Sequence, residues 1–161
     1  MPNLKIFFSV LLIATALHNS EPAALYNSVM NKMFASVSKC TREVNGKISP
    51  ELCLMEFDGI HNPNDPQFDG CKAAMTCAFK KLDYMHENGK WNQDKLLSLR
   101  NGIKNQDALR EFDQTFETCG SVGGTNGEAV INMITCVLNS SNRAKQSYNE
   151  LKDTFMSGYD E

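Results

Sequence analysis

The chain of 161 residues is 42% hydrophobic and 22% charged, with a formal net charge of −3 at pH 7. This length suffices for one domain with one hydrophobic core. A mildly acidic chain lacks the positive surface that binds nucleic acid or anionic lipid, so the composition argues against both of these partners.

Residues 1–20 have the pattern of a secretory signal peptide. Lys5 precedes an apolar run over residues 6–16, and small and polar residues follow it. The run is too short to span a bilayer, which argues against the alternative of a membrane anchor. We expect cleavage between residues 16 and 20, secretion, and a single helical domain over residues 21–161.

Apolar residues recur at intervals of three and four along the rest of the chain, which is the pattern of amphipathic helices. The first predicted helix covers about residues 22–39 and stops before "VNGK". A short helix follows, with Ser49 as its N-cap, Pro50 in its first turn and Gly59 at its end.

The next helix is predicted from Asp65 or Asp69 to about Glu87, because Asn88-Gly89 is typical of a helix C-terminus. Further helices are predicted over about residues 92–101, 107–119 and 127–140, and the tail from residue 143 can form one more. The sequence therefore predicts an all-α fold of six or seven short helices.

Six cysteines, at positions 40, 53, 71, 77, 119 and 136, are an even number in a chain predicted to be secreted, which indicates three disulfides. Six cysteines allow 15 pairings, and sequence alone does not choose among them. A zinc site is the alternative. Because the chain has no C-x2-C pair, and the histidines that follow the predicted signal peptide, His61 and His86, are isolated, we predict no metal and no other cofactor.

The stretch "CKAAMTCAFKKLDYMHENGKW", residues 71–91, resembles the insect odorant-binding proteins. In that family a helix with paired cysteines is followed by an acidic-Asn-Gly turn and a further helix. Cys40, Cys77, Cys119 and Cys136 match the family's first, third, fourth and sixth cysteines in spacing. The resemblance implies helices packed around a hydrophobic cavity and linked by three disulfides. Odorant-binding-like proteins of mites and ticks also have altered cysteine patterns, so an insect source does not follow.

Two positions depart from the family pattern. The family's second and fifth cysteines, which bond to each other, correspond here to Ala73 and Gly127. Both are missing together, as in the minus-C subgroup. Because the missing bridge would join two helices, we hypothesise a wider or more open pocket than usual.

The resemblance also implies a disulfide pairing. It gives the bonds Cys40–Cys77 and Cys119–Cys136, and it leaves Cys53 and Cys71 for a third bond. On a helix, Cys71 and Cys77 would lie about 120° apart, in agreement with different partners. Alternatively, Cys71 is the family's second cysteine displaced by two residues, which again leaves Cys53 as its partner.

The pocket candidates are apolar residues on the inward stripes of the predicted helices. They are Met30, Phe34, Phe57, Met75, Phe79, Leu82, Trp91, Leu96, Phe112, Phe116, Val130, Met133, Ile134 and Val137. The alternative for each is an ordinary core residue. Tyr26, Tyr84 and Tyr148 are candidates for a polar group that orients a ligand.

The function implied by the resemblance is a secreted, extracellular carrier of small hydrophobic ligands such as odorants, semiochemicals or lipids, with a chemosensory receptor as a second candidate partner. We expect that the protein is not an enzyme, since its sequence lacks the catalytic motifs of phospholipases, P-loop proteins and serine hydrolases. The alternatives are a saposin-like lipid-binding protein and a scavenger of saliva or haemolymph. Asn139-Ser140-Ser141 is a glycosylation sequon, so Asn139 is a candidate for modification.

Overall fold

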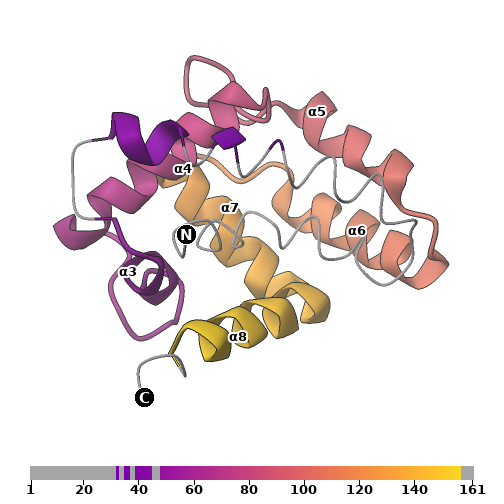
Figure 1. Ribbon diagram of the computed structural model, residues 1–161. Helices are drawn as coiled ribbons and strands as arrows, with labels where there is room; N and C mark the ends of the chain where they lie inside the picture. Colours follow the sequence, from indigo (N-terminus) through magenta and orange to yellow (C-terminus); the bar gives the residue numbers. More distant parts are fainter. Residues whose placement is uncertain (1–31, 33–34, 37–38, 45–47, 157–161) are drawn as a thin grey trace.

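The structure, a computed structural model, describes residues 32, 35–36, 39–44 and 48–156 (Figure 1). Its elements are α3 (Pro50–Met55), η3 (Pro66–Phe68), α4 (Asp69–Lys81), α5 (Gln93–Ser98), η4 (Leu99–Gly102), α6 (Gln106–Cys119), α7 (Gly127–Ser140) and α8 (Asn142–Met156). Within these residues the predicted all-α fold is confirmed, and extended pairing is limited to one isolated bridge, Met85 with Trp91.

Some sequence predictions lie outside the described residues. They are the signal peptide of residues 1–20, most of the helix predicted over residues 22–39, and the pocket candidates Met30 and Phe34. Residues 39–43 are helical. Among the described helices, none is both long and apolar enough to cross a membrane.

The helix starts follow from their capping residues. Ser49 caps α3 as predicted, since its hydroxyl oxygen accepts a hydrogen bond from Leu52 N at 3.1 Å. Asn92 caps α5 in the same way through Lys95 N, at 3.2 Å. α3 is shorter than predicted, because it ends at Met55 and not at Gly59.

The predicted end of α4 near Glu87 is wrong, because the helix stops at Lys81. Asp83 then takes a positive φ of 63°, which breaks the helical path. Asn88-Gly89 instead forms a tight turn, in which Gly89 N donates to His86 O at 2.9 Å. The sequence signal for left-handed backbone is real, but it belongs to this turn and not to a helix end.

The turn at Gly89 docks on the start of α7. Gly89 O accepts a hydrogen bond from Asn126 N at 2.8 Å. Gly89 has φ +80°, and a Cβ there would lie 2.7 Å from the Asn126 nitrogen, so only glycine fits. Trp91 anchors the same loop: its ring lies 4.7 Å from that of Phe79, and its Nε1 donates to Ala129 O at 3.1 Å.

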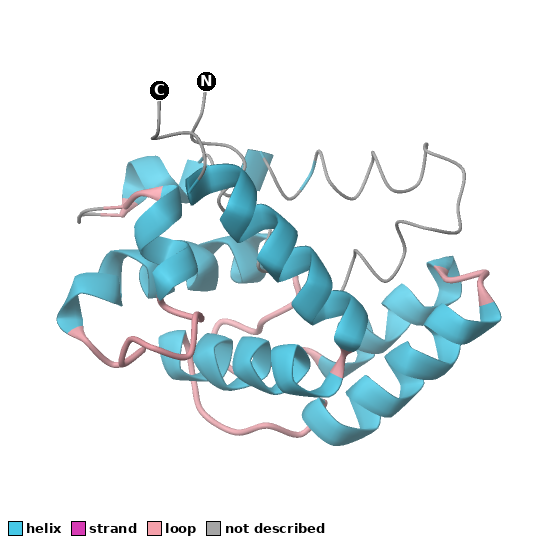
Figure 2. Ribbon diagram, turned by 90° about the horizontal axis from the view of Figure 1, so that it is seen from below, coloured by secondary structure: helices cyan, strands magenta, loops and turns pink. Residues whose placement is uncertain are grey.

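Helix α7 lies at the centre of the fold, with α4, α6 and α8 packed against it (Figure 1). Figure 2 shows the same bundle turned by 90°, with loops that join the described helices. The exposed polar side chains of α7 form one narrow stripe, at Glu128, Asn132, Thr135 and Asn139. Apolar residues occupy more than half of the helix circumference, so neighbouring helices must cover those sides. Its buried residues are Ala129, Val130, Ile131, Met133, Ile134, Val137 and Leu138.

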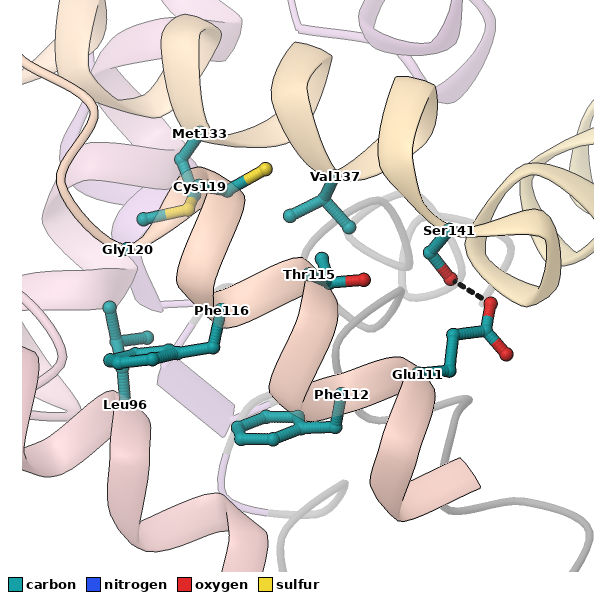
Figure 3. A pocket seen from close by; sticks show the side chains of 10 residues that line it. All are labelled: Leu96, Glu111, Phe112, Thr115, Phe116, Cys119, Gly120, Met133, Val137 and Ser141. Atoms are coloured by element: carbon teal, nitrogen blue, oxygen red, sulfur yellow. Dashed lines mark hydrogen bonds between the residues drawn. The ribbon is translucent and has the colours of Figure 1, made fainter. Parts of the chain in front are cut away.

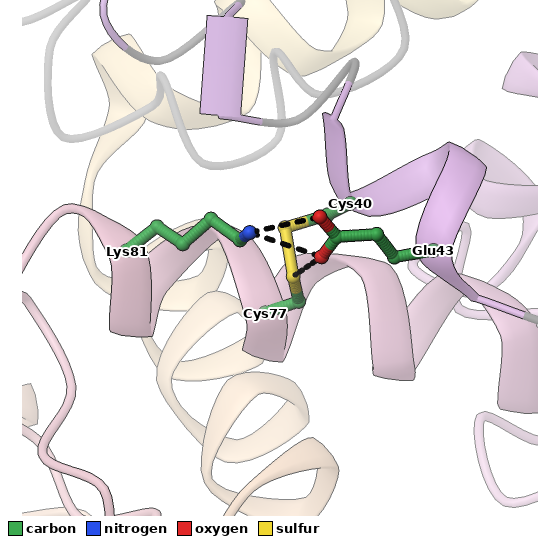
Figure 4. Close-up of a disulfide and its surroundings, with 4 residues drawn as sticks. All are labelled: Cys40, Glu43, Cys77 and Lys81. Carbon is green, nitrogen blue, oxygen red and sulfur yellow. Dashed lines mark hydrogen bonds and ion pairs between the residues drawn. A yellow bond between two sulfur atoms is a disulfide. The ribbon is translucent and has the colours of Figure 1, made fainter.

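The three disulfides join the pairs that the resemblance implied: Cys40–Cys77, Cys53–Cys71 and Cys119–Cys136. The second links α3 to α4, and the third links α6 to α7. At the first bond, Glu43 Oε2 lies 3.8 Å from Cys77 Sγ and 2.9 Å from Lys81 Nζ (Figure 4). The hydrogen bond from Lys81 lowers the pKa of Glu43.

Helix α8, the tail helix, is tied to α3 by Tyr148. Its hydroxyl donates to Leu54 O at 2.7 Å, and both residues are buried. Burial, followed by the charge of Asp58, raises the pKa of this phenol, so it stays a donor at all ordinary pH values. A polar group of Tyr148 is therefore used to close the fold and not to bind a ligand.

Glu56 is a buried carboxyl group at the end of α3. It is 2% exposed, and neither carboxyl oxygen has a hydrogen-bond partner within the described structure. Burial raises its pKa to about 8, against the opposing charge of Lys72, while Asp69 adds to the increase. The side chain is therefore mostly neutral at pH 7.

Removing the Cys53–Cys71 disulfide should destabilise the protein strongly. Its cysteines are 18 residues apart, and a cross-link of that span contributes about 3 kcal/mol by restricting the unfolded chain. We expect the double variant Cys53→Ser, Cys71→Ser to lose roughly this much free energy of unfolding in urea titrations. A loss below about 1 kcal/mol would mean that packing alone holds α3 on α4.

Glu56→Gln should stabilise the protein at neutral pH. The folded-state pKa lies above the ordinary value, 4.5, so the folded protein binds more protons and its stability falls as pH rises from 4.5 to about 8. The glutamine variant does not ionise and should gain roughly 2–3 kcal/mol at pH 7. Urea titrations between pH 4.5 and 8 measure how the free energy of unfolding changes with pH in the wild type and in the variant. The exposed Glu117→Gln on α6 is the control, and an unchanged slope in Glu56→Gln would contradict the assignment.

Candidate functional site

A cavity of about 40 Å³ lies between α5, α6 and α7 (Figure 3). We call it the α6–α7 pocket. It is lined by Leu96, Glu111, Phe112, Thr115, Phe116, Cys119, Gly120, Met133, Val137 and Ser141. The Cys119–Cys136 disulfide lies at one end of α6 and fixes that end to α7.

The walls of the pocket are apolar. Phe112 and Phe116 are four residues apart on α6, so they share one face, and their rings stack with centroids 6.0 Å apart. Met133 and Val137 have the same spacing on α7 and face them. Leu96 closes the pocket from α5, of which it is the only buried residue.

Glu111 forms the polar rim where α6 meets the junction of α7 and α8. Its Oε1 accepts hydrogen bonds from Ser141 Oγ at 2.6 Å and from Arg143 N at 3.1 Å. Arg143 Nε donates to Oε2 at 2.9 Å. Burial alone would raise the pKa of Glu111, but these hydrogen bonds and the charge of Arg143 outweigh it and lower the pKa. Glu111 therefore lines the pocket as a carboxylate.

Thr115 brings a second polar group to the pocket. It lies four residues after Glu111, on the same face of α6. Its hydroxyl oxygen is buried and has no hydrogen-bond partner in the described part of the chain. In Figure 3 this hydroxyl points to the side on which Ser141 and Glu111 lie.

The structure divides the predicted pocket residues into three groups. Leu96, Phe112, Phe116, Met133 and Val137 line the α6–α7 pocket. Met75, Phe79, Trp91, Val130 and Ile134 are buried in the core, and Phe57 and Leu82 are half-buried against it. Met30 and Phe34 lie outside the described residues.

The polar lining residues were not among the sequence candidates. Glu111, Thr115 and Ser141 carry no motif of their own. Ser141 could have been recognised as an N-cap, since its Oγ accepts a hydrogen bond from Ala144 N at 3.1 Å at the start of α8. Of the tyrosines considered as polar handles, Tyr84 packs under Lys95 and Tyr148 binds Leu54, while Tyr26 is outside the described residues.

The sequon lies at the end of α7. Asn139 is exposed, whereas Ser141 is buried and uses its hydroxyl to bind Glu111. The folded chain therefore holds part of the sequon inside the pocket rim, and glycosylation of Asn139 stays a prediction.

The positions of the missing bridge, Ala73 and Gly127, line a surface groove between α4 and the start of α7. At Gly127 the two helices approach closely, because a Cβ there would lie 3.0 Å from Lys72 Cβ. The expected spreading of these helices is not seen at this point.

Metal-ligand atoms converge at one place in the described residues, at Cys40, Glu43 and Cys77. Both sulfurs belong to a disulfide, so they are not available as thiolate ligands.

The fold and the pocket together define a disulfide-linked helical binding protein. A sequence model of the PBP/GOBP family matches residues 23–140, so the chain belongs to this family of odorant-binding proteins. Members of the family are binding proteins and not enzymes. No curated protein and no solved structure matches the chain at a significant level.

Replacing Glu111 by alanine should destabilise the junction of α6, α7 and α8. The variant loses three charge-assisted hydrogen bonds and leaves Ser141 Oγ and Arg143 N without their acceptor, which costs roughly 2 kcal/mol at neutral pH. Chemical denaturation measures the difference. Glu117→Ala, exposed on the same helix, should change stability by less than about 0.5 kcal/mol.

This contribution of Glu111 should also depend on pH. Its folded-state pKa lies below its ordinary value of 4.5, so the stabilisation is complete above pH 4.5 and is lost as pH falls through the folded-state pKa. The difference between wild type and Glu111→Ala should therefore shrink in acid. A difference that stays constant would mean that charge plays no part.

Proposed function

We propose that the protein is a secreted carrier that binds a small hydrophobic ligand, such as an odorant, a semiochemical or a lipid, in the α6–α7 pocket. The apolar character of this pocket is the observation that carries the proposal, since burial of an apolar ligand needs no reactive group. Membership of the PBP/GOBP family supports it. The predicted signal peptide supports an extracellular location, where a chemosensory receptor is a candidate partner.

The pocket must enlarge to hold a ligand. Ligand pockets usually measure about 300–1,000 Å³, and the cavity between the described helices is about 40 Å³. Helix α5 is the wall best suited to move, because it is six residues long and buries only Leu96. Gln93 Nε2 donates to Gly120 O and holds α5 against the end of α6.

The missing bridge favours this enlargement. Without a bond between positions 73 and 127, α4 and α7 are held together by packing and by the docked loop around Trp91. Non-covalent contacts can rearrange when a ligand enters, whereas a disulfide would fix the two helices. The wider pocket hypothesised from the missing bridge is not seen in this structure, where the cavity is about 40 Å³ and α4 does not line it.

Filling the pocket should abolish binding. Leu96→Phe adds a ring inside the cavity at a stability cost of roughly 1–3 kcal/mol. We expect the affinity for a fluorescent apolar probe to fall at least about tenfold, and displacement by odorants and fatty acids to fall with it.

The neighbouring residue supplies a matched control. Leu97 is 43% exposed, so Leu97→Phe makes the same chemical change outside the pocket and should bind the probe like the wild type. If wild type with intact disulfides takes up no probe, the carrier function is wrong. If both variants bind equally well, the ligand lies elsewhere in the molecule.

A further inference from the structure

We propose that the α6–α7 pocket selects uncharged ligands with one terminal hydrogen-bonding group, such as aliphatic alcohols and aldehydes, over carboxylates, and that Thr115 is the residue that recognises this group. The inference rests on the proposed carrier function and names the ligand class of the same pocket.

Thr115 is suited to bind the polar group of the ligand, because its own hydroxyl group has no hydrogen-bond partner in the described structure. A threonine in a helix can bond to the carbonyl oxygen one turn earlier, as the nearby Thr118 does with Gln114 O at 2.9 Å. Thr115 makes no such bond in the described structure, although its hydroxyl oxygen is shielded from solvent. A buried hydroxyl without a partner is costly, so a ligand that supplies one gains affinity.

The hydroxyl of Thr115 can both donate and accept a hydrogen bond. It therefore suits an alcohol, which donates or accepts, and an aldehyde, which accepts. Apart from the polar rim at Glu111 and Ser141, the walls around it are apolar and consist mainly of Phe112, Phe116, Met133 and Val137. A ligand with several polar groups would leave the others unpaired against these walls.

Glu111 determines the charge that the pocket tolerates. Its carboxylate lines the pocket one helical turn from Thr115, while its partner Arg143 is not part of the lining. A ligand carboxylate bound at Thr115 would lie beside a negative charge in a poorly hydrated space. Repulsion from the Glu111 carboxylate and the loss of its own hydration shell both weaken the binding of a ligand carboxylate.

The test compares three ligands of equal chain length, octan-1-ol, octane and octanoate, by probe displacement at neutral pH. We expect wild type to bind octanol at least about tenfold more tightly than octanoate. Thr115→Val keeps the shape of the side chain and removes the hydroxyl. It should weaken octanol binding roughly tenfold and leave octane unchanged. Glu111→Gln should narrow the gap between octanol and octanoate.

Two controls separate the explanations. Thr118→Val makes the same substitution at an exposed site on α6 and should change no affinity. Thr115→Val should unfold at the same or a higher temperature than wild type, because it removes an unpaired hydroxyl, so weaker octanol binding cannot reflect misfolding.

The outcomes distinguish the two proposals. If no ligand displaces the probe, the carrier function itself is wrong. If octanol and octanoate bind equally, or if Thr115→Val leaves octanol binding unchanged, the carrier function stands and the inferred selectivity is overturned.

Discussion

The burial of α7 is the constraint on which the rest of the structure depends. Buried apolar residues cover more than half of its circumference, so this helix is stable in water only when other helices cover those sides. α4, α6 and α8 each cover one side of it. The pocket lies between α6 and α7, where the stacked rings of Phe112 and Phe116 and the smaller Thr115 line it from α6.

Non-covalent contacts join α4 to α7 at the positions where the resemblance places a family disulfide. At these positions this chain has Gly127 packed against Lys72 and a loop docked through Gly89 and Trp91. Such contacts are non-covalent, so they hold α7 on α4 by packing and hydrogen bonding alone. The three disulfides tie neighbouring segments to this pair of helices: Cys40–Cys77 and Cys53–Cys71 reach α4, and Cys119–Cys136 reaches α7.

Local patterns in the sequence predicted much of this fold. Periodic apolar residues and caps such as Ser49 and Asn92 report short-range physics, so α3, α5 and α7 were placed near their true positions. The end of α4 was missed because Asn88-Gly89 signals left-handed backbone without saying which turn uses it. The docking of that turn on Asn126, 37 positions further along the chain, is a tertiary contact.

The residues of the pocket were also predicted only in part, because local sequence patterns do not reveal tertiary contacts. Apolar stripes identified Phe112, Met133 and other wall residues, but they also selected core residues such as Met75, since both kinds are buried on the same helix faces. Glu111 and Thr115 could not be found in this way. Their roles depend on which partners the fold brings to them, Ser141 and Arg143 in one case and none in the other.

The hydrogen bond from Tyr148 to Leu54 spans 94 residues, so during synthesis α3 emerges long before α8 can cover its carbonyl group. The Cys53–Cys71 bond, which spans only 18 residues, can form in the growing chain and hold α3 on α4 until the tail arrives.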